Sequence, residues 1–407
     1  MMTHPITLAI SLGRATFAVL PLYVAFGAVL GFIQTALPAI LQREGVPLTL
    51  VGFATLLFLP FGLSALWAPL VDRYGSERFG RRRGWILVCQ GIVVAALLIC
   101  AALEPHTALL LLLPMGVAAA TMDVALDGFL VETARDDAER ALRGPLKVGG
   151  VYGGMLIGST AILAIYERLG WTNAILVLAA LALLAPLGFA RDCEPSGDDH
   201  LHRPWPKLSA LTRRPNGLRL VVSSVALGIA LGLGISGFRL LLVAIGLPLA
   251  SIGVAFGVAG GLAGIVGAAF AGFLGRTLGS SATLAASGTG LALLLSLAAA
   301  AGTAFPATGL IASAFVAACY AAYAILYSAL CALAMRTCAS DQAATDYAIF
   351  QSGWTLAGIA GGVLSGLAVA ALGWPVVFLV AALGVATSAL VASTTRSAPP
   401  AVEGVQP

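Results

Sequence analysis

Two acidic side chains lie four residues apart within an apolar stretch, in the segment Thr121-Met-Asp123-Val-Ala-Leu-Asp127-Gly128. In a helix this spacing places Asp123 and Asp127 on one face. Two carboxylates this close in a medium of low dielectric do not ionise together readily, so one of them would bind a proton near neutral pH. The pair therefore predicts proton coupling, carried chiefly by Asp123. In the alternative, Asp127, and Asp123 with it, pairs with an arginine of the loop at 73–83.

One basic residue lies deep in an apolar stretch of the second part of the chain, in Ser236-Gly237-Phe238-Arg239. A guanidinium that faces a central cavity can bind a substrate carboxylate through two parallel hydrogen bonds. The alternative is that the Arg239 side chain reaches out to the nearby membrane surface, which costs little. The sequence leaves both interpretations open.

Further polar and aromatic side chains within apolar stretches are candidates for lining a cavity. Three tyrosines, at positions 320, 323 and 327, share one helical face and would suit an aromatic ligand. Core packing remains the alternative for each residue taken singly. The candidates are Gln34, Tyr152, Tyr320, Tyr323, Tyr327, Gln351 and Trp354.

The most specific motif lies in a short polar loop. It reads Ala68-Pro-Leu-Val-Asp72-Arg73-Tyr-Gly75 and continues as Phe79-Gly80-Arg81-Arg82-Arg83-Gly84-Trp85. An acidic residue at the end of one helix, followed by a glycine and an arginine cluster at the start of the next, predicts a gate at the inner membrane surface. The alternative is that the arginines only anchor the loop there, although anchoring requires neither Asp72 nor Gly80.

The elements that must position these residues are membrane-spanning helices. The chain is 59% hydrophobic and only 10% charged, far from the composition of soluble proteins. About 20 apolar residues are needed for a helix to cross a hydrocarbon core of roughly 30 Å. Hydropathy predicts twelve spans. They lie near 16–39, 50–71, 84–103, 107–130, 147–166, 171–190, 217–245, 251–274, 281–301, 306–331, 345–371 and 374–395.

The distribution of positive charge supports this count. With both termini cytoplasmic, only Arg43, Arg168 and Arg239 of the 22 lysines and arginines fall at or near the outer side. The longest polar segment divides the spans into six and six, which is typical of secondary transporters. We therefore expect an N-terminal six-helix half at 1–190, a cytoplasmic linker at 191–216, a C-terminal half at 217–395 and a disordered tail at 396–407.

The Asp72 motif resembles the inner-loop signature of the major facilitator superfamily, and the resemblance extends over the whole chain. The segments Leu66–Arg73, Phe79–Trp85 and Thr121–Gly128 are similar to the branch that contains the AmpG-type muropeptide permeases and the acetyl-coenzyme A transporters. In the second half, Ala344-Thr345-Asp346-Tyr347-Ala-Ile-Phe350-Gln351 resembles the siderophore permeases of the RhtX/FptX type. The resemblance implies a major facilitator fold of twelve helices in two pseudo-symmetric halves, and it adds Asp346 to the gate motif.

The sequence thus predicts a secondary transporter of the bacterial inner membrane that imports a siderophore or similar anionic amphipathic solute with protons. An anhydromuropeptide permease is the alternative substrate class, and a pigment–protein assembly factor on the same scaffold is the alternative of another kind. Histidines are scattered and no GxxxxGK[ST] motif occurs, so we expect neither an enzyme nor ATP-driven transport. We expect no cofactor, no metal and no nucleic acid, and a monomer whose partners are membrane lipid and a small-molecule substrate.

Overall fold

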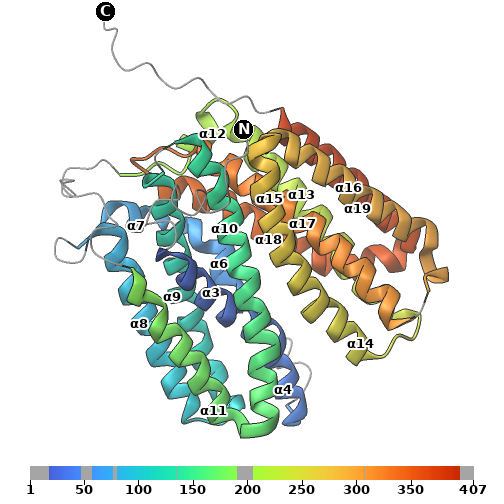
Figure 1. Cartoon of the computed structure of the whole chain (residues 1–407), viewed down its shortest axis with the longest axis horizontal. Coiled ribbons are helices and arrows are strands. Elements are labelled where there is room, and N and C mark those ends of the chain that lie inside the picture. The colour runs from blue at the N-terminus through green and yellow to red at the C-terminus, as the bar shows by residue number, and fades with distance from the viewer. Residues whose placement is uncertain are drawn as a thin grey trace, which may run out of the picture.

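The computed structural model describes residues 18–46, 57–76, 80–134, 136–189, 205–306 and 308–394. In these ranges every element of more than a few residues is helical, and the only strand-like feature is an isolated bridge between Ser76 and Gly80. The helices form two bundles that lie side by side, with the earlier part of the chain in one and the later part in the other (Figure 1). The structure confirms the all-helical fold class with two halves.

The N-terminal half is built from spans that are often interrupted by short irregular helical turns. The first span is formed by three consecutive elements, of which the middle one is a π-helix. The elements of this half are α3 (Leu20–Gly31), η1 (Phe32–Ala36), α4 (Leu37–Arg43), α6 (Leu59–Leu63), η3 (Ser64–Leu66), α7 (Ala68–Arg73), α8 (Arg81–Ala101), α9 (Pro105–Glu132), α10 (Asp137–Leu156), η4 (Ile157–Ala161), α11 (Ile162–Leu184) and η5 (Ala185–Gly188).

The C-terminal half contains longer unbroken helices. A short helix precedes it in the segment between the halves, α12 (Ala210–Arg213). The elements that follow are α13 (Gly217–Ala244), α14 (Leu249–Gly253), η8 (Val254–Ala259), α15 (Gly260–Thr277), α16 (Ser280–Ala301), η9 (Gly302–Ala304), α17 (Gly309–Thr337), α18 (Ala343–Leu372) and α19 (Trp374–Ser393).

The number of spans can be compared directly with the predicted twelve. Ten helical stretches of the described chain are long and apolar enough to cross a membrane, and one of them, Glu139–Gly188, is 50 residues long. This stretch turns at Gly170, whose φ of 81° interrupts the helix, so it holds two spans. The predicted second span lies partly outside the described residues and is broken at Ser64–Leu66. The count of twelve therefore stays a prediction at this one span.

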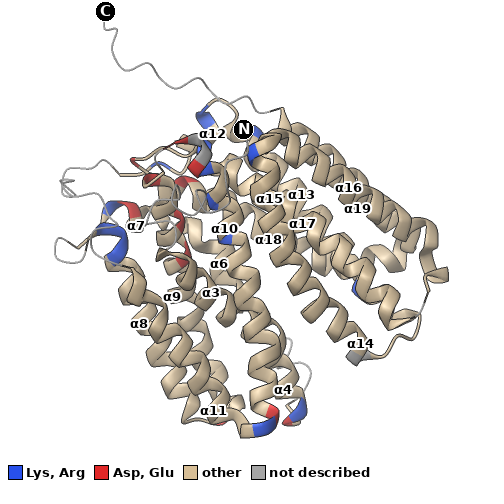
Figure 2. Ribbon diagram, in the orientation of Figure 1, with Lys and Arg blue, Asp and Glu red and all other residues tan. Residues whose placement is uncertain are grey.

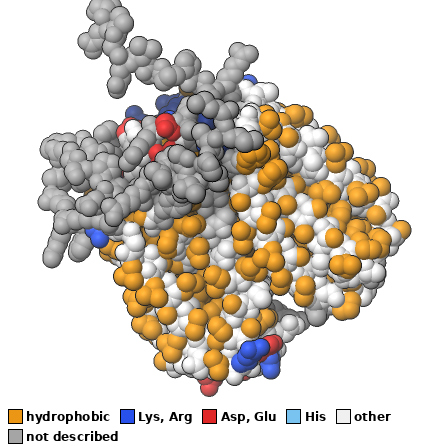
Figure 3. Space-filling model, in the orientation of Figure 1, with side chains coloured by type: hydrophobic (Ala, Val, Ile, Leu, Met, Phe, Trp, Pro, Cys, Tyr) orange, Lys and Arg blue, Asp and Glu red, His pale blue; other side chains and the backbone are white. Residues whose placement is uncertain are grey.

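The outer surface of the bundles fits a hydrocarbon environment. Leucines on several helices are largely exposed, with Leu110 at 80%, Leu187 at 77% and Leu310 at 82%. Orange apolar side chains are spread over the whole of the face that is not hidden by grey atoms in Figure 3, and charged side chains are nearly absent from its middle. Charged residues gather instead at two ends of the molecule (Figure 2). We call the end with α7 and α12 the charged end, and the end with α4, α11 and α14 the opposite end.

At the charged end the two halves are in close contact. A Cβ atom on Gly128 of α9 would lie 2.9 Å from the Cβ of Ala344 on α18, and one on Gly144 of α10 would lie 2.4 Å from the carbonyl oxygen of Ser328 on α17. Only glycine permits such an approach. The halves diverge toward the opposite end (Figure 1). The structure is thus closed at the charged end.

Candidate functional site

A buried group of charged side chains lies in the N-terminal half, between α3, α9 and α10. The Lys147 ammonium donates to both carboxylate oxygens of Asp127, at 2.7 and 2.6 Å, and its nitrogen is 3.4 Å from an oxygen of Asp123. Tyr23 donates its hydroxyl to Asp127 at 2.9 Å. We call these four residues the acid–lysine cluster.

When both aspartates are ionised and Lys147 is protonated, the acid–lysine cluster carries one net negative charge. The cluster is almost completely buried. Its four residues are 0 to 6% exposed, and the Asp123 oxygen that lies 3.4 Å from Lys147 makes no hydrogen bond among the described residues. Buried charges are tolerated when they are paired, and an unpaired one is costly. Of the two acids, Asp127 is therefore held firmly and Asp123 is the one with an unused acceptor.

Lys147 was not among the residues that the sequence singled out, and it corrects one expectation. The alternative interpretation paired Asp127 with an arginine of the 73–83 loop, but its partner is Lys147. The error has a simple cause, because the fifth span was predicted to begin at Lys147. The helix begins ten residues earlier, at Asp137, so Lys147 lies about 15 Å along it.

The cluster also contacts the other half of the protein. The Lys147 nitrogen lies 5.0 Å from the ring centroid of Tyr347 on α18 and 5.8 Å from that of Tyr23 on α3. An ammonium at this distance from an aromatic face is attracted to it. Lys147 is therefore shared between the two acids of α9 and an aromatic ring of the C-terminal half.

Five aromatic side chains meet beside the acid–lysine cluster, and we call them the aromatic cluster. The Tyr323 and Tyr327 rings are nearly parallel at 5.9 Å, and Trp354 of α18 lies 4.8 Å from Tyr327. Tyr152 of α10 contacts the rings of Tyr320 and Tyr323 at 6.3 and 6.5 Å. The expectation that the three tyrosines of α17 share a face is confirmed by these contacts.

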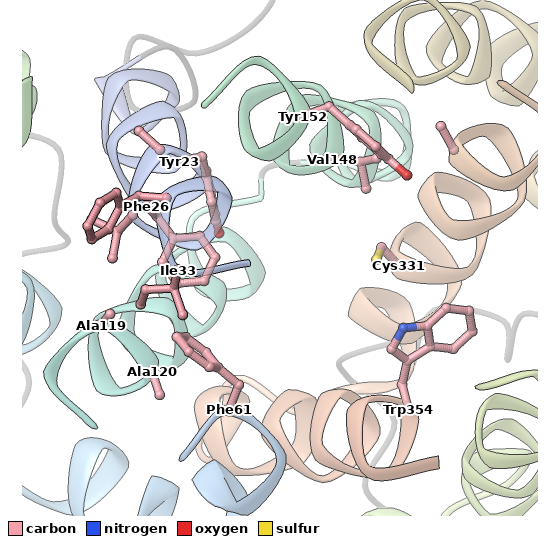
Figure 4. Packing of buried hydrophobic residues seen from close by; sticks show 14 of the residues in the cluster. Tyr23, Phe26, Ile33, Phe61, Ala119, Ala120, Val148, Tyr152, Cys331 and Trp354 are labelled. Carbon is pink, nitrogen blue, oxygen red and sulfur yellow. The ribbon is translucent and has the colours of Figure 1, made fainter. Parts of the chain in front are cut away.

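The aromatic cluster faces the space between the halves. Figure 4 shows Tyr152 and Val148 on one side, Cys331 and Trp354 on another, and Tyr23, Ile33 and Phe61 around the remainder of a common space. Tyr327 donates its hydroxyl to the side-chain oxygen of Gln351 at 2.8 Å, which fixes that ring in place. The structure thus brings together the predicted residues Tyr152, Tyr323, Tyr327, Gln351 and Trp354.

Arg239 approaches this region from the opposite end. Its guanidinium carbon lies 4.7 Å from the ring centroid of Phe256, and this ring lies 6.1 Å from that of Tyr320. Arg239 itself is exposed. Arg239 lies about 8 Å from the end of α13, whereas Tyr320 lies about 16 Å from the adjacent end of α17. The guanidinium is thus exposed yet stacks on a ring that adjoins the aromatic cluster, and both interpretations of Arg239 stay open.

Gln34 is the one predicted cavity residue that the described contacts do not join to the others. It lies in the π-helix η1 and is exposed. Short π-helices inside longer helices often occur at functional sites. The element η1 therefore stays a candidate for the substrate path, although no described contact joins the Gln34 side chain to the aromatic cluster.

The motif around Asp72 forms the contact between the halves at the charged end. The Asp72 carboxylate accepts hydrogen bonds from the backbone nitrogens of Ala344 and Thr345, at 3.2 and 2.6 Å, and from the Thr345 hydroxyl at 2.5 Å. These donors belong to the first turn of α18, where the helix dipole favours a negative charge. An acid of one half therefore caps a helix of the other half.

Two arginines of the motif hold Asp72 in this position. Arg82 forms an ion pair with Asp72 and also donates to the Val71 carbonyl at 3.0 Å. Arg81 and Arg82 both lie 2.5 Å from the same oxygen of Glu132, at the end of α9. Glu132 was missed by the sequence interpretation, because it lies beyond the motif, but it links the motif to the helix that carries Asp123 and Asp127.

The remaining motif residues have other surroundings. Gly80 has a φ of 88°, a conformation that allows the turn into α8. Arg73 lies over the ring of Trp205, with its guanidinium carbon 5.7 Å from the centroid. Arg83 is half-buried on the first turn of α8.

Asp346 is placed at the charged end but has a different partner from the motif arginines. It forms an ion pair with Arg214 and accepts from the Ala339 backbone at 2.9 Å and from Gln342 at 2.6 Å. Arg214 lies in the segment that joins the two halves. Asp346 therefore attaches this segment to α18, and its neighbour Thr345 provides the contact with Asp72.

Two bundles of apolar helices that are closed at one end, with charged and aromatic residues between them, are typical of secondary transporters. The model of the Major Facilitator Superfamily matches residues 19–344. The chain therefore belongs to this superfamily and is a multi-pass membrane protein.

Part of the chain is similar in sequence to a permease of known substrate class. The anhydromuropeptide permease of Escherichia coli is 30% identical over 270 residues, which correspond to 62% of this chain and 54% of that protein. The chain thus matches about half the length of this relative.

Solved structures agree with the fold. A bacterial homologue of the iron transporter ferroportin in an outward-facing state has a TM-score of 0.71 at 12% identity, over 93% of this chain and 97% of that one. The Major Facilitator Superfamily transporter FucP in the outward conformation has a TM-score of 0.68 at 15% identity, over 94% and 100%. At these identities the likeness concerns the fold alone.

Proposed function

We propose that this chain is a proton-coupled importer of a carboxylate-bearing, amphipathic solute of the anhydromuropeptide class. The observation that carries the proposal is the arrangement of two unlike groups around one space, the acid–lysine cluster on one side and the aromatic cluster with Gln351 on the other. The substrate class is supported by the 30% identity to an anhydromuropeptide permease and by the sequence blocks that resemble this branch.

Substrate recognition is assigned to the aromatic cluster and Arg239. Ring faces such as those of Tyr323, Tyr327 and Trp354 provide flat apolar surfaces for the body of a solute. The Arg239 guanidinium has no carboxylate partner in the described part of the chain, so a carboxylate of the solute would complete it. Tyr152 would bring the N-terminal half into contact with the same ligand.

Coupling is assigned to Asp123, Asp127 and Lys147. A proton on Asp123 would remove the net negative charge of the cluster and leave Lys147 paired with Asp127 alone. Because Lys147 also lies against Tyr347 of α18, a change in its pairing would alter the contact between the halves. The proton would thereby influence which end of the transporter is closed.

The contact of Asp72 with the first turn of α18 is assigned to the gate. It would hold the charged end shut while solute enters from the opposite end, and it would separate when the protein opens inward. In this proposal the charged end faces the cytoplasm of a bacterium, the protein is a monomer in the inner membrane, and both termini are cytoplasmic. The segment between the halves is then a cytoplasmic linker.

Siderophore import remains the competing substrate class, since the block from Ala344 to Gln351 resembles siderophore permeases. One experiment separates the two classes. A strain that lacks its own permeases is complemented with this chain, and uptake of labelled anhydromuropeptide is compared with uptake of labelled siderophore. We expect saturable anhydromuropeptide uptake that a protonophore abolishes, and an Asp72→Asn control that is inserted but impaired.

The opposite result would be saturable accumulation of the siderophore alone. It would make siderophores the substrate class and leave the proposed role as a transporter unchanged. Uptake of neither, together with a pigment absorbance in the purified protein, would favour the assembly-factor alternative. Accumulation that is insensitive to the protonophore would remove the coupling role.

A further inference from the structure

The C-terminal half contains an apolar pocket lined by its own residues alone. It lies among α13, η8, α16 and α17, and only side chains of these elements line it. Its lining residues are Leu231, Gly234, Ile235, Phe238, Phe256, Leu291, Leu295, Phe315, Val316, Cys319, Tyr320 and Tyr323.

The pocket adjoins both the aromatic cluster and Arg239. Tyr320 and Tyr323 belong to the aromatic cluster and to the pocket wall, so the two spaces share a boundary. Phe256 forms another part of the wall, and the Arg239 guanidinium lies on this ring at 4.7 Å. A positive charge without a described carboxylate partner therefore stands next to an apolar pocket.

We propose that this pocket binds a short apolar group of the transported solute, while Arg239 binds an anionic group attached close to it. The inference rests on the proposed function and specifies the ligand further, as an anion with an adjacent alkyl substituent. Charge complementarity identifies the occupant. An apolar lining alone would accept any hydrocarbon, whereas the guanidinium beside the pocket selects a ligand whose apolar group carries a negative charge next to it.

The structure provides a native probe of the pocket, because Cys319 is part of its lining and is half-buried. A variant in which Cys89, Cys100, Cys193, Cys331 and Cys338 are replaced by alanine leaves this thiol as the only one. Purified in nanodiscs, it is treated with two methanethiosulfonates of similar size, one bearing a sulfonate and one bearing a trimethylammonium group. The rate of Cys319 modification is measured for each by mass spectrometry.

We expect the anionic reagent to react at least tenfold faster than the cationic one. The preference should disappear in Arg239→Gln, because that substitution removes the charge beside the pocket. As a matched control, a cysteine introduced by Leu310→Cys on the exposed face of the same helix should show no charge preference that depends on Arg239. Linear carboxylates from acetate to pentanoate should protect Cys319 with half-effective concentrations that fall about three- to fourfold per added methylene.

The proposal is overturned if Cys319 reacts equally with both reagents, if it does not react while the cysteine at position 310 does, or if pentylamine protects as well as pentanoate. None of these readings depends on transport. Evidence against the proposed pocket is thus distinguishable from evidence against the proposed substrate class, because the uptake assay measures only the latter.

Discussion

The two halves of this transporter have a common architecture but different interiors. In the described part of the N-terminal half the buried charged residues include Asp72, Arg82, Asp123, Asp127 and Lys147, whereas in that of the C-terminal half Asp346 is the one buried acid, and it lies at the charged end. The interior of the C-terminal half is instead aromatic and apolar.

This difference suggests a division of roles between the halves. The charges to which we assign proton coupling lie in the half where several spans are interrupted, and the flat ring surfaces lie in the half where most spans are continuous helices. Among the places where the two halves meet are Lys147 beside Tyr347, Tyr152 beside Tyr323, and Asp72 at the first turn of α18. Substitutions at these positions and around them test whether coupling and recognition are separable.

The largest effect is expected for Lys147→Ala. It leaves Asp123 and Asp127 buried without a cation, and loss of one partner of a buried pair typically costs about 3–5 kcal/mol. We expect a clearly lower melting temperature and no transport. The double variant Lys147→Met with Asp127→Asn removes the strongest pair as a whole and should recover much of the stability without transport. A single variant as stable as the wild type would show that the cluster is not buried as described.

A smaller effect on stability, with a large one on transport, is expected for Asp72→Asn. The amide loses the ion pair with Arg82 and weakens the cap on α18, while the surrounding helices keep their packing. Abundance in the membrane should be unchanged and the initial uptake rate strongly reduced. Glu104→Gln, an exposed acid at the opposite end, is the matched control and should leave uptake unaltered. Normal uptake by Asp72→Asn would reduce the motif to an anchor of the loop.

Arg239 tests recognition in the C-terminal half without touching the acids. In the proposed complex the solute covers the guanidinium, and loss of a charge-assisted contact buried in this way typically costs roughly 2–5 kcal/mol, so Arg239→Ala should raise the half-saturation concentration at least about tenfold. Arg239→Lys should recover only part of the affinity, because the two-bond geometry is lost. Arg43→Ala, which removes an exposed arginine, is the control. Unchanged half-saturation in Arg239→Ala would favour the interpretation that this side chain only reaches the surface.

The smallest effect is expected for Gln351→Ala. This change removes one hydrogen bond that holds the Tyr327 ring, a contribution of about 0.5–1.5 kcal/mol, so affinity should fall roughly two- to tenfold. Gln34→Ala should have no such effect, because Gln34 is not joined to the aromatic cluster by the described contacts. Equal losses for the two variants would place Gln34 in the substrate path, as the sequence predicted.

Much of the fold can be predicted from the sequence, because the apolar length of each span and the positions of the arginines can be read directly along the chain. The shared face of Tyr320, Tyr323 and Tyr327 follows in the same way from helical periodicity. Contacts between spans are a different matter. That Lys147 meets Asp127, or that Asp72 caps α18, depends on how helices distant in the chain pack, and no local pattern encodes it.

The error over Lys147 shows where the limit lies. A hydropathy window ends a span at the first charged residue, but this helix continues for ten residues before Lys147, through Arg143 and Pro145. A lysine at that depth is stable only with nearby acids. Combining the depth of Lys147 with the two aspartates of the preceding span would have predicted the pair.

The central claim is that the N-terminal half couples transport to protons while the C-terminal half binds the solute, and Asp123→Asn tests it most directly. The neutral amide resembles the protonated acid. In proteoliposomes preloaded with unlabelled anhydromuropeptide, the variant should exchange labelled substrate at a half-saturation concentration like that of the wild type. Under an imposed proton gradient, without preloading, it should fail to accumulate substrate above equilibrium. Two results would contradict the division of roles between the two halves. One is accumulation equal to that of the wild type, and the other is a variant that neither exchanges nor accumulates the substrate.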